Sequence, residues 1–131
     1  MKTYMTVHAV AVYKNQVLVL QRANGRSNPG KWNCVTGYVQ ERESAEVAAV
    51  RELKEETNLE GELIKTTEPF WADSDDIRWT VVSSLIKIKD ISDMKIDENE
   101  SRAYQWINFD DQIVKNSKAL QMSLAKLGLL L

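Results

Sequence analysis

Short stretches of β-branched, aliphatic and aromatic residues recur along the chain, and polar or glycine-containing segments separate them. In residues 79–89, for example, the last five positions alternate with a period of two, with Ile86 and Ile88 on one side and Leu85, Lys87 and Lys89 on the other, which is typical of a strand. The pattern predicts a series of β-strands, the first two joined by a hairpin turn at residues 14–16. The predicted strands cover residues 4–13, 17–20, 32–39, 63–70, 79–89 and 102–107.

Residues 44–57 have the pattern of an α-helix instead. Ser44 is a favourable N-cap, an acidic residue lies in the first turn, and the interior contains neither glycine nor proline. A second helix is predicted to start at residue 110 or 111 and to run to about residue 127. Strands around one central helix, with another helix closing the chain, predict an α/β (α+β) fold.

The two faces of the first predicted helix differ in chemistry. At about 100° per residue, Glu52, Glu55 and Glu56 fall on one face together with small alanines. Small side chains on this face leave room for a bound group close to the helix. We expect the opposite, more apolar face to pack against the sheet. Its residues are Val47, Val50, Leu53 and Thr57.

Length and composition narrow the class of protein. The chain has 131 residues, of which 44% are hydrophobic and 27% charged, without repeats or linkers, so we expect one domain spanning residues 1–131. No apolar run approaches the roughly 20 residues of a membrane span, and the first residues lack a signal peptide's apolar core. A lone Cys34 and a lone His8 exclude a disulfide framework and a Cys/His zinc cluster. These features predict a soluble, cytoplasmic protein without a membrane partner.

Charge is unevenly distributed, although the net charge is only −2. Residues 41–60 contain seven glutamates against three basic residues, and residues 93–100 form a second acidic segment. Such segments are either solvated faces or two parts of a cation site. The sequence contains no basic stripe, so we expect no stable nucleic-acid partner.

The three glutamates of the helix favour the cation site over a solvated face. Glu52 lies three and four positions before Glu55 and Glu56, where like charges repel one another on a helix. Glu55 and Glu56 also lie in the last turn, where the helix dipole favours cations. A divalent cation would offset both effects, and carboxylate oxygens suit Mg²⁺ or Mn²⁺ rather than zinc. Nearby on the helix, Arg51 has the geometry to clamp Glu43 in the preceding loop, with a weak surface ion pair as the alternative.

These residues match a known motif. The Nudix box has the form G-x5-E-x7-R-E-U-x-E-E-x-G-U, where U is a bulky aliphatic residue, and only its second glycine is replaced here, by Asn58. The matching positions are Gly37, Glu43, Arg51, Glu52, Leu53, Glu55, Glu56 and Leu59. The chain therefore resembles the Nudix hydrolases, which cleave nucleoside diphosphates linked to another moiety. The resemblance implies an α/β/α sandwich with a mixed central sheet.

The resemblance also implies roles for single residues. Glu52, Glu55 and Glu56 would bind Mg²⁺ (or Mn²⁺), joined by the backbone carbonyl of Gly37. Glu43 would orient Arg51 and so hold the loop against the helix.

Many relatives carry a further acidic residue shortly before the last strand. Glu100, six residues before Trp106, occupies that place, with Glu98 as the alternative. Glu52 is the preferred general base for activating water, and Glu100 is the second choice.

The activity implied by the resemblance is metal-dependent hydrolysis of a pyrophosphate bond in a nucleoside triphosphate or similar nucleotide-like triphosphate. The segments W-x-x-V-T-G at residues 32–37 and E-x-x-A-Y-x-W at residues 100–106 resemble the dihydroneopterin triphosphate pyrophosphatase branch, which adds a pterin triphosphate as a substrate class. Arg22 is a candidate phosphate contact, with an ordinary surface arginine as the alternative. Trp71 and Trp79 are candidates for stacking on a base, with packing as the alternative.

Other functions stay open at this point. One is a Nudix-fold module that binds nucleotides without cleaving them, although such modules typically lose box carboxylates that this chain retains. Others are hydrolysis of ADP-ribose or of diadenosine polyphosphates, although the subfamily marks of both are missing. Homodimers are common among relatives, and the apolar tail at residues 129–131 is a candidate interface. Cys34 and His8 are expected to be structural.

Overall fold

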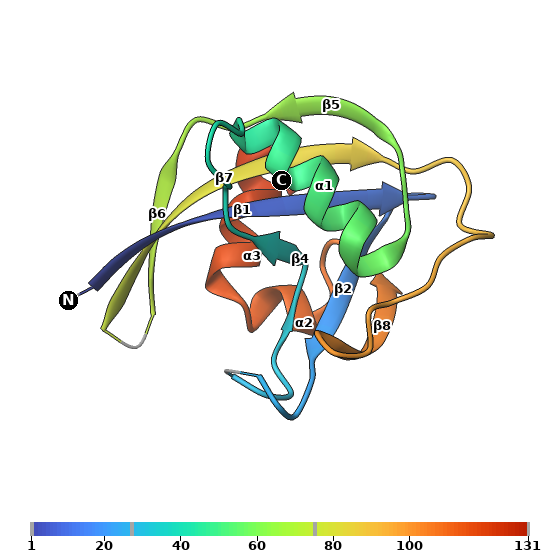
Figure 1. Cartoon of the computed structure of the whole chain (residues 1–131), viewed down its shortest axis with the longest axis horizontal. Coiled ribbons are helices and arrows are strands. Elements are labelled where there is room, and N and C mark those ends of the chain that lie inside the picture. Colours follow the sequence, from blue (N-terminus) through green and yellow to red (C-terminus); the bar gives the residue numbers. More distant parts are fainter. Residues whose placement is uncertain (1, 27, 75, 131) are drawn as a thin grey trace.

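The computed structural model describes residues 2–26, 28–74 and 76–130. Within these ranges the chain forms eight strands and three helices, which are labelled in Figure 1. In chain order they are β1 (Lys2–Tyr13), β2 (Gln16–Arg22), β3 (Trp32–Asn33), β4 (Val35–Gly37), α1 (Ala45–Thr57), β5 (Glu62–Thr66), β6 (Phe70–Ser74), β7 (Ile77–Lys87), β8 (Ser101–Ile107), α2 (Gln112–Lys115) and α3 (Lys118–Lys126).

The sheet is mixed and divides beside β1. β1 and β7 run parallel along their whole length, while β5 and β6 both lie antiparallel on the outer edge of β7. On its other edge, β1 pairs with β4 near its middle but with β2 only at its end, through Val12–Val17 and Tyr13–Gln16. β2 continues the sheet into β3 and β8. The short β4 and the group of β2, β3 and β8 therefore diverge, and α1 lies above the point where they part (Figure 1).

Helices cover both faces of this sheet, α1 on one side and α3 on the other (Figure 1). One core contains Ala49 and Leu53 of α1 against apolar residues of β1, β2 and β7, such as Leu18. The second core contains Leu120 and Leu124 of α3 against residues of β1, β2 and β8. Because successive strand residues point to opposite faces, β1 supplies both cores. The predicted α+β fold, with a mixed sheet between helices, is confirmed.

Two predicted elements are divided in the structure. The strand predicted at residues 63–70 is two strands, β5 and β6, separated around Pro69, which has no N–H to donate to a neighbouring strand. The long C-terminal helix is also two helices, because Asn116 ends α2 and Ser117 caps α3 by accepting from the Leu120 N–H. In both places a local stop signal overrides the apolar pattern.

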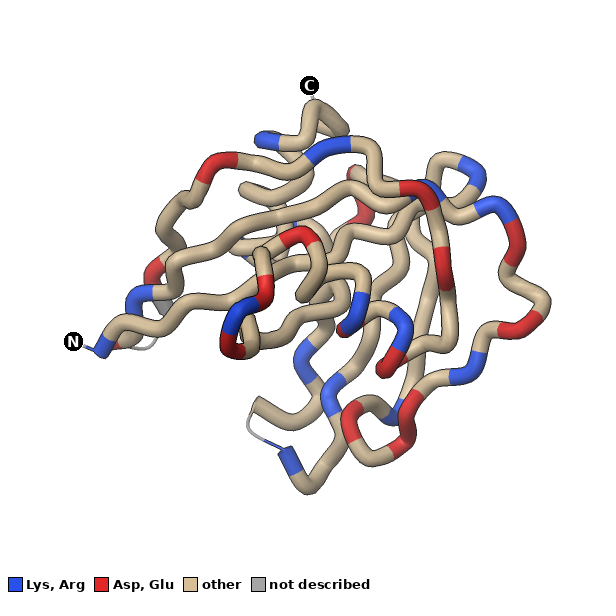
Figure 2. Tube along the Cα trace, turned by 45° about the horizontal axis from the view of Figure 1, so that its top comes forward, with Lys and Arg blue, Asp and Glu red and all other residues tan. Residues whose placement is uncertain are grey.

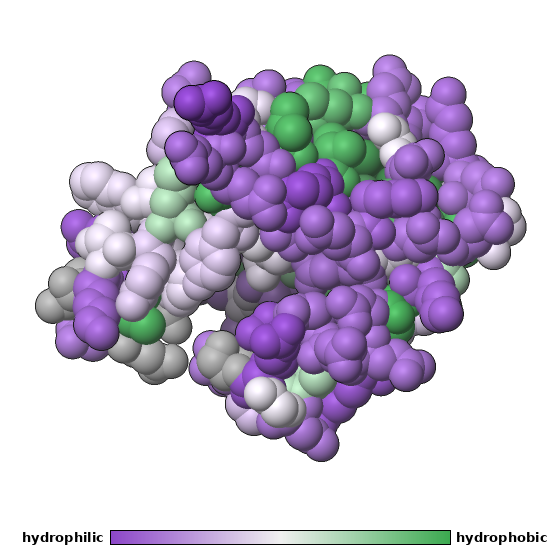
Figure 3. Space-filling model, in the orientation of Figure 1, coloured by the Kyte–Doolittle hydropathy of each residue, from purple (hydrophilic) through white to green (hydrophobic). Residues whose placement is uncertain are grey.

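Of the four residues predicted to face the sheet from α1, Leu53 and Thr57 are buried as expected, whereas Val47 and Val50 are not. Val47 and Val50 are 57% and 40% exposed, whereas Ala48 and Ala49 are completely buried. Alanine side chains let the helix approach the sheet closely, so the alanine face packs inward and turns Glu56 inward with it. The valines instead form part of an apolar surface over α1 and β5, visible as the green area at the top of Figure 3.

The apolar C-terminal tail packs on the second core. Leu129 and Leu130 are partly buried against the second core, so they are largely occupied by packing within the chain, and Leu131 lies outside the described residues. No helix in the described ranges has both the length and the apolar character needed to cross a membrane.

Candidate functional site

Gly37, at the end of β4, brings the backbone into contact with a carboxyl group of α1. A Cβ atom added to Gly37 would lie only 2.2 Å from the Glu52 carboxyl carbon, so no other residue type fits without displacing Glu52. The Gly37 carbonyl accepts a hydrogen bond of 2.8 Å from Thr6 Oγ1 on β1, and a carbonyl oxygen has a second lone pair. The Glu52 carboxyl group therefore lies against the backbone of Gly37, where β4 meets α1.

Arg51 joins the loop before α1 to the helix. Its Nε lies 2.7 Å from Glu43 Oε2 and its Nη2 lies 3.0 Å from Glu43 Oε1. Nη2 also donates to the Tyr38 carbonyl at 3.0 Å. The hydrogen bond from Arg51, helped by the Gln40 N–H, lowers the pKa of the Glu43 carboxyl. Glu43 therefore stays ionised and keeps the loop folded back onto the helix.

The same guanidinium also reaches the acidic face of α1. Nη1 of Arg51 lies 3.0 Å from Glu52 Oε1 and 3.1 Å from Glu55 Oε2. The Glu55 side chain is 55% exposed, whereas that of Glu52 is largely covered. Glu55 therefore lies at the rim of the site and Glu52 inside it.

Glu56 is the most deeply placed of these carboxyl groups. The residue is 9% exposed, and its Oε2 is buried without a hydrogen-bond partner among the described residues. Burial raises the pKa of Glu56 to about 9, and repulsion from Glu52 and Glu100 adds to the rise. A buried carboxylate that faces two others is costly unless a proton or a cation neutralises it.

Glu100 lies just before β8, close enough to Glu56 for its charge to act on that carboxyl group. Its Oε2 lies 3.7 Å from Arg22 Nη1 at the end of β2, and its Oε1 is bound by Arg26. Glu98, the alternative predicted from the sequence, is exposed. Of the second acidic segment, Glu100 is thus the residue whose charge acts on Glu56.

These residues fit a hard divalent cation. The donors are carboxylate oxygens and one backbone carbonyl, which Mg²⁺ and Mn²⁺ prefer, and the partnerless oxygen of Glu56 lies among them. Within the described ranges, no three acidic, histidine or cysteine side chains are close enough to share one ion as they stand. Arginines hold several of these groups instead: Arg51 binds Glu52 and Glu55, while Arg26 binds Glu100. Binding of one ion by these groups would therefore require some of the side chains to rotate away from the arginines.

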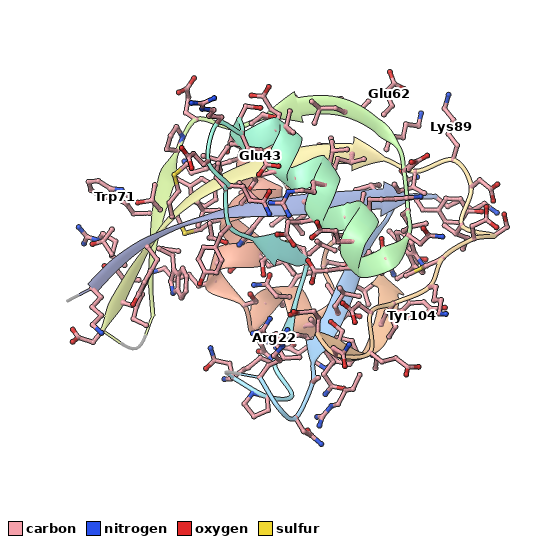
Figure 4. All side chains as sticks on the ribbon, in the orientation of Figure 1. Arg22, Glu43, Glu62, Trp71, Lys89 and Tyr104 are labelled. Carbon is pink, nitrogen blue, oxygen red and sulfur yellow. The ribbon has the colours of Figure 1, made fainter. Side chains whose placement is uncertain are left out.

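The two candidate tryptophans lie on opposite faces of the β6–β7 pair. Trp79 is paired with Ala72, and Trp71 with Thr80, so the two indole rings point to different sides. Trp71 is 62% exposed, and the Arg78 guanidinium lies over its ring. Figure 4 shows Trp71 at the left of the molecule, away from Arg22. Trp71 and Trp79 therefore belong to different surfaces, and a single bound ring cannot stack on both.

Trp79 shares its face with two residues that the sequence did not single out. Its ring centroid lies 5.5 Å from that of Tyr4, its partner on β1, and Thr6 follows on the same face of that strand. Thr6 bonds the Gly37 carbonyl, so this aromatic surface leads toward the acidic groups. Figure 3 shows the molecule hollowed between the lobe formed by the ends of β1, β6 and β7 and the lobe below it. Strand alternation could have suggested Tyr4 and Thr6, whereas nothing in the sequence pointed to Arg26.

Cys34 and His8 lie in the core. Burial raises the pKa of the Cys34 thiol, so the thiolate needed for nucleophilic attack is disfavoured. Burial lowers the pKa of His8 to about 4, and its Nδ1 lies 2.8 Å from Ser123 Oγ. Both residues serve packing within the described structure.

Comparisons with known proteins give a consistent result. The model of the NUDIX domain family matches residues 2–126. A search of curated proteins finds no match. Among solved structures, a MutT Nudix hydrolase from Burkholderia pseudomallei aligns with a TM-score of 0.79 at 18% identity, over 97% of this chain and 99% of that chain.

Two further solved structures are similar. The dihydroneopterin triphosphate pyrophosphohydrolase of E. coli has a TM-score of 0.71 at 25% identity, over 92% of this chain and 91% of that chain. An Ap4A hydrolase of C. elegans has a TM-score of 0.73 at 20% identity, over 98% of this chain and 96% of that chain. The family match over nearly the whole length, on a fold with this arrangement of carboxylates, shows that the chain belongs to the Nudix family and is a pyrophosphohydrolase acting on phosphorus-containing acid anhydrides.

Proposed function

We propose that this protein hydrolyses a pyrophosphate bond of a nucleoside triphosphate, or of a similar nucleotide-like triphosphate such as a pterin triphosphate, with Mg²⁺ or Mn²⁺ as cofactor. The observation that carries the proposal is Glu56, a buried carboxyl group whose Oε2 has no partner among the described residues and which faces Glu52 and Glu100. A divalent cation neutralises such a group better than any nearby side chain does.

In this proposal Glu52, Glu55, Glu56 and the Gly37 carbonyl hold the cation, with Glu100 as an additional ligand. The cation supplies neutralisation of the phosphate oxygens and a bound water of lowered pKa. Arg51 positions the ligands rather than the substrate, since its nitrogens are taken up by Glu43, Glu52 and Glu55.

Glu52 is the proposed general base. It lies against the Gly37 backbone, and its side chain is 17% exposed, so it can reach water at the edge of the site. Arg51 Nη1 lies 3.0 Å from Glu52 Oε1 and helps to fix the position of that carboxylate. Glu100 is the second choice, because in the metal-free arrangement it is held by Arg26 and lies near Arg22.

The triphosphate part of the substrate is proposed to contact Arg22, which lies beside Glu100 at the end of β2. For the ring system we propose Trp79 together with Tyr4, since their paired rings form an aromatic surface that leads toward the acidic groups. Stacking on such a surface contributes about 1–3 kcal/mol per base in single-strand binders. Trp71 faces the other side of the sheet and has no place in this proposal.

The likeness to the E. coli dihydroneopterin triphosphate pyrophosphohydrolase, at 25% identity, supports including a pterin triphosphate. The likeness to the C. elegans Ap4A hydrolase supports testing dinucleoside polyphosphates as a second substrate class. A module that binds nucleotides without cleaving them would have no use for a full set of ionisable ligands. All box carboxylates are retained here, which supports hydrolysis.

The proposed partner is a small molecule in the cytoplasm, not a nucleic acid. In the view of Figure 2, lysines and arginines are interspersed with aspartates and glutamates, without the continuous basic stripe that nucleic-acid binding favours. A homodimer stays a proposal as well, and the exposed apolar surface over α1 and β5 suits it better than the partly buried tail does.

The test offers the purified protein ordinary and oxidised nucleoside triphosphates, a pterin triphosphate, ADP-ribose and diadenosine polyphosphates, each with Mg²⁺. Hydrolysis products are separated by chromatography and quantified for the wild type, Glu56→Gln and Glu46→Gln, because ADP-ribose and diadenosine polyphosphates are cleaved without release of phosphate or pyrophosphate. Glu46 is an exposed glutamate on the same helix, so its variant is a charge-matched control. We expect turnover by the wild type and by the Glu46 variant, and a large loss in Glu56→Gln. No turnover of any compound, with nucleotide binding intact, would favour the binding module.

A further inference from the structure

The C-terminal end of α1 is unusual for the motif it belongs to, because Asn58 stands where the Nudix box has glycine. Asn58 adopts the left-handed conformation, with φ 59° and ψ 19°, and its N–H donates to the Lys54 carbonyl at 3.0 Å. Glycine adopts this conformation at the lowest cost, and asparagine is the next best residue. The amide of asparagine, however, can make a contact that glycine cannot.

That contact ties the helix to the segment between β7 and β8. Asn58 Nδ2 donates to the Asp93 carbonyl at 2.9 Å. Two more hydrogen bonds follow in order: the Lys95 N–H donates to the Thr57 carbonyl at 2.9 Å, and the Asp97 N–H donates to the Glu56 carbonyl at 2.8 Å. The last carbonyls of a helix have no partner within the helix, so this segment supplies the missing donors.

We call residues 93–97, bonded in this way to the end of α1, the clasp. Neighbouring apolar side chains hold the segment down, since Ile91, Met94 and Ile96 are partly buried against the first core. Both main-chain hydrogen bonds of the clasp would form with any residue at position 58. The bond from the Asn58 side chain is the part of the clasp that depends on this residue.

The clasp leads directly to Glu100. The Asp97 carbonyl accepts from the Glu100 N–H at 3.1 Å and from the Ser101 N–H at 3.0 Å, while Asp97 Oδ1 accepts from the Asn99 N–H at 3.0 Å. Asp97 therefore bonds the backbone of Glu56 on one side and that of Glu100 on the other. These are the two acidic residues that approach each other from α1 and from β8.

We propose that Asn58 is a positioning residue: by fastening the clasp to the end of α1, its side chain sets the place of Glu100 relative to Glu56 in the metal site. The inference rests on the proposed function, because it assumes that Glu100 is a ligand of the cation. Asn58 itself touches neither substrate nor cation. Its departure from the box glycine is then a gain of a contact rather than a tolerated replacement.

The test uses the full chain in five forms: wild type, Asn58→Gly, Glu100→Gln, the double variant of these two, and Glu56→Gln. Asn58→Gly keeps a residue that suits the left-handed conformation, so the helix end is preserved while the side-chain bond is lost. The first measurement is amide hydrogen exchange without metal. We expect exchange at Lys95 and Asp97 to become about three- to tenfold faster in Asn58→Gly, with the α1 interior unchanged.

The second measurement is the affinity for Mn²⁺ alone, by titration with detection of free Mn²⁺. We expect Asn58→Gly to weaken binding about tenfold, as loss of a supporting contact around a metal typically does. In the Glu100→Gln background the same substitution is expected to change the affinity less than twofold, because the ligand it positions is already gone.

Three results would overturn the inference. Unchanged amide exchange at Lys95 and Asp97 would mean that Asn58 does not fasten the clasp, regardless of the result for Mn²⁺ affinity. An equal loss of Mn²⁺ affinity with and without Glu100 would mean that Asn58 acts by another route. Equal binding by wild type and Glu100→Gln would remove Glu100 from the site. Failure of the wider metal proposal is distinguished from all three, since Glu56→Gln would then bind Mn²⁺ as the wild type does.

Discussion

Arg51 binds Glu43 through two nitrogens, Nε 2.7 Å from one carboxylate oxygen and Nη2 3.0 Å from the other, although eight residues separate them in the chain. The loop between β4 and α1 is thereby folded back, and the third nitrogen of Arg51 reaches Glu52 and Glu55, two of the proposed metal ligands. Charge and planarity both contribute, since lysine cannot form this two-point contact.

Glu43→Gln is therefore expected to lower kcat/KM by about tenfold to a hundredfold, because small displacements of positioned groups are costly to catalysis. The amide keeps an acceptor for the Gln40 N–H but loses the charge that orients Arg51. Steady-state hydrolysis measures the effect, and Glu41→Gln, an exposed neighbour, is the control. Equal activity in both variants would contradict the role of the pair.

Gly37→Ala is expected to displace Glu52, since the added Cβ would lie 2.2 Å from its carboxyl carbon. We expect a loss of at least a hundredfold in activity and a decrease of about 1–3 kcal/mol in the free energy of unfolding. The matched control is Gly25→Ala, because a Cβ there meets no atom within 4 Å. Chemical denaturation and hydrolysis assays test both variants, and a fully active Gly37→Ala would refute the close contact.

Glu56→Gln is expected to change the pH dependence of stability in metal-free protein. The folded-state pKa of about 9 is above the ordinary value of 4.5, so the wild-type free energy of unfolding falls as pH rises through that window. Glutamine does not titrate, so the variant becomes relatively more stable toward pH 8. Thermal melts at pH 5 and pH 8 with a chelator measure this difference.

The wild type and Glu56→Gln are also expected to differ in their response to Mg²⁺. Added Mg²⁺ should raise the Tm of the wild type, because the ion binds the folded state, and should leave Glu56→Gln nearly unchanged. A similar rise in both proteins would mean that the ion binds elsewhere.

His8→Asn tests the other strongly shifted group of the core. The pKa of His8 is lowered by burial from 6.5 to about 4, so the unfolded chain takes up a proton in this window while the folded chain does not. Wild-type stability is therefore expected to fall by about 3 kcal/mol relative to the variant between pH 7 and pH 4. Urea denaturation across this range gives the difference, and parallel pH curves for the two proteins would contradict the assignment.

Ala49→Leu tests which face of α1 is buried. Ala49 is completely covered, so a larger side chain should lower the free energy of unfolding by about 1–3 kcal/mol. Val50→Lys, at a position 40% exposed, should change it by less than about 0.5 kcal/mol. The helical pattern alone predicts the opposite result, a larger loss of unfolding free energy for Val50→Lys than for Ala49→Leu. Denaturation midpoints separate the two outcomes.

The sequence was sufficient for features that depend on local spacing. Helix start and end signals at Ser44 and Asn58 lie where α1 begins and ends, and the spacing of Gly37, Glu43 and Arg51 identified the family. Such features were predictable because they involve groups separated by one or a few turns of the same segment.

Features that depend on distant parts of the chain were not predictable. The helical pattern placed the valines of α1 inward, but close packing on the sheet favours the alanines, and this buries Glu56. Trp71 and Trp79 looked equivalent until the register of β6 on β7 put them on opposite faces. Glu100 was already preferred over Glu98 from its spacing to Trp106, but the action of its charge on Glu56 became visible only in the structure.

The sequence by itself thus determined the family, the central helix and the residue types of the proposed metal site, because the Nudix box is defined by residue types at fixed separations. Only the tertiary structure decided which carboxyl group is buried, which arginines hold the others, and how Asn58 joins α1 to the segment that carries Glu100. The physical reason is that burial, register and long-range hydrogen bonds are properties of segments packed together, and no single segment contains them.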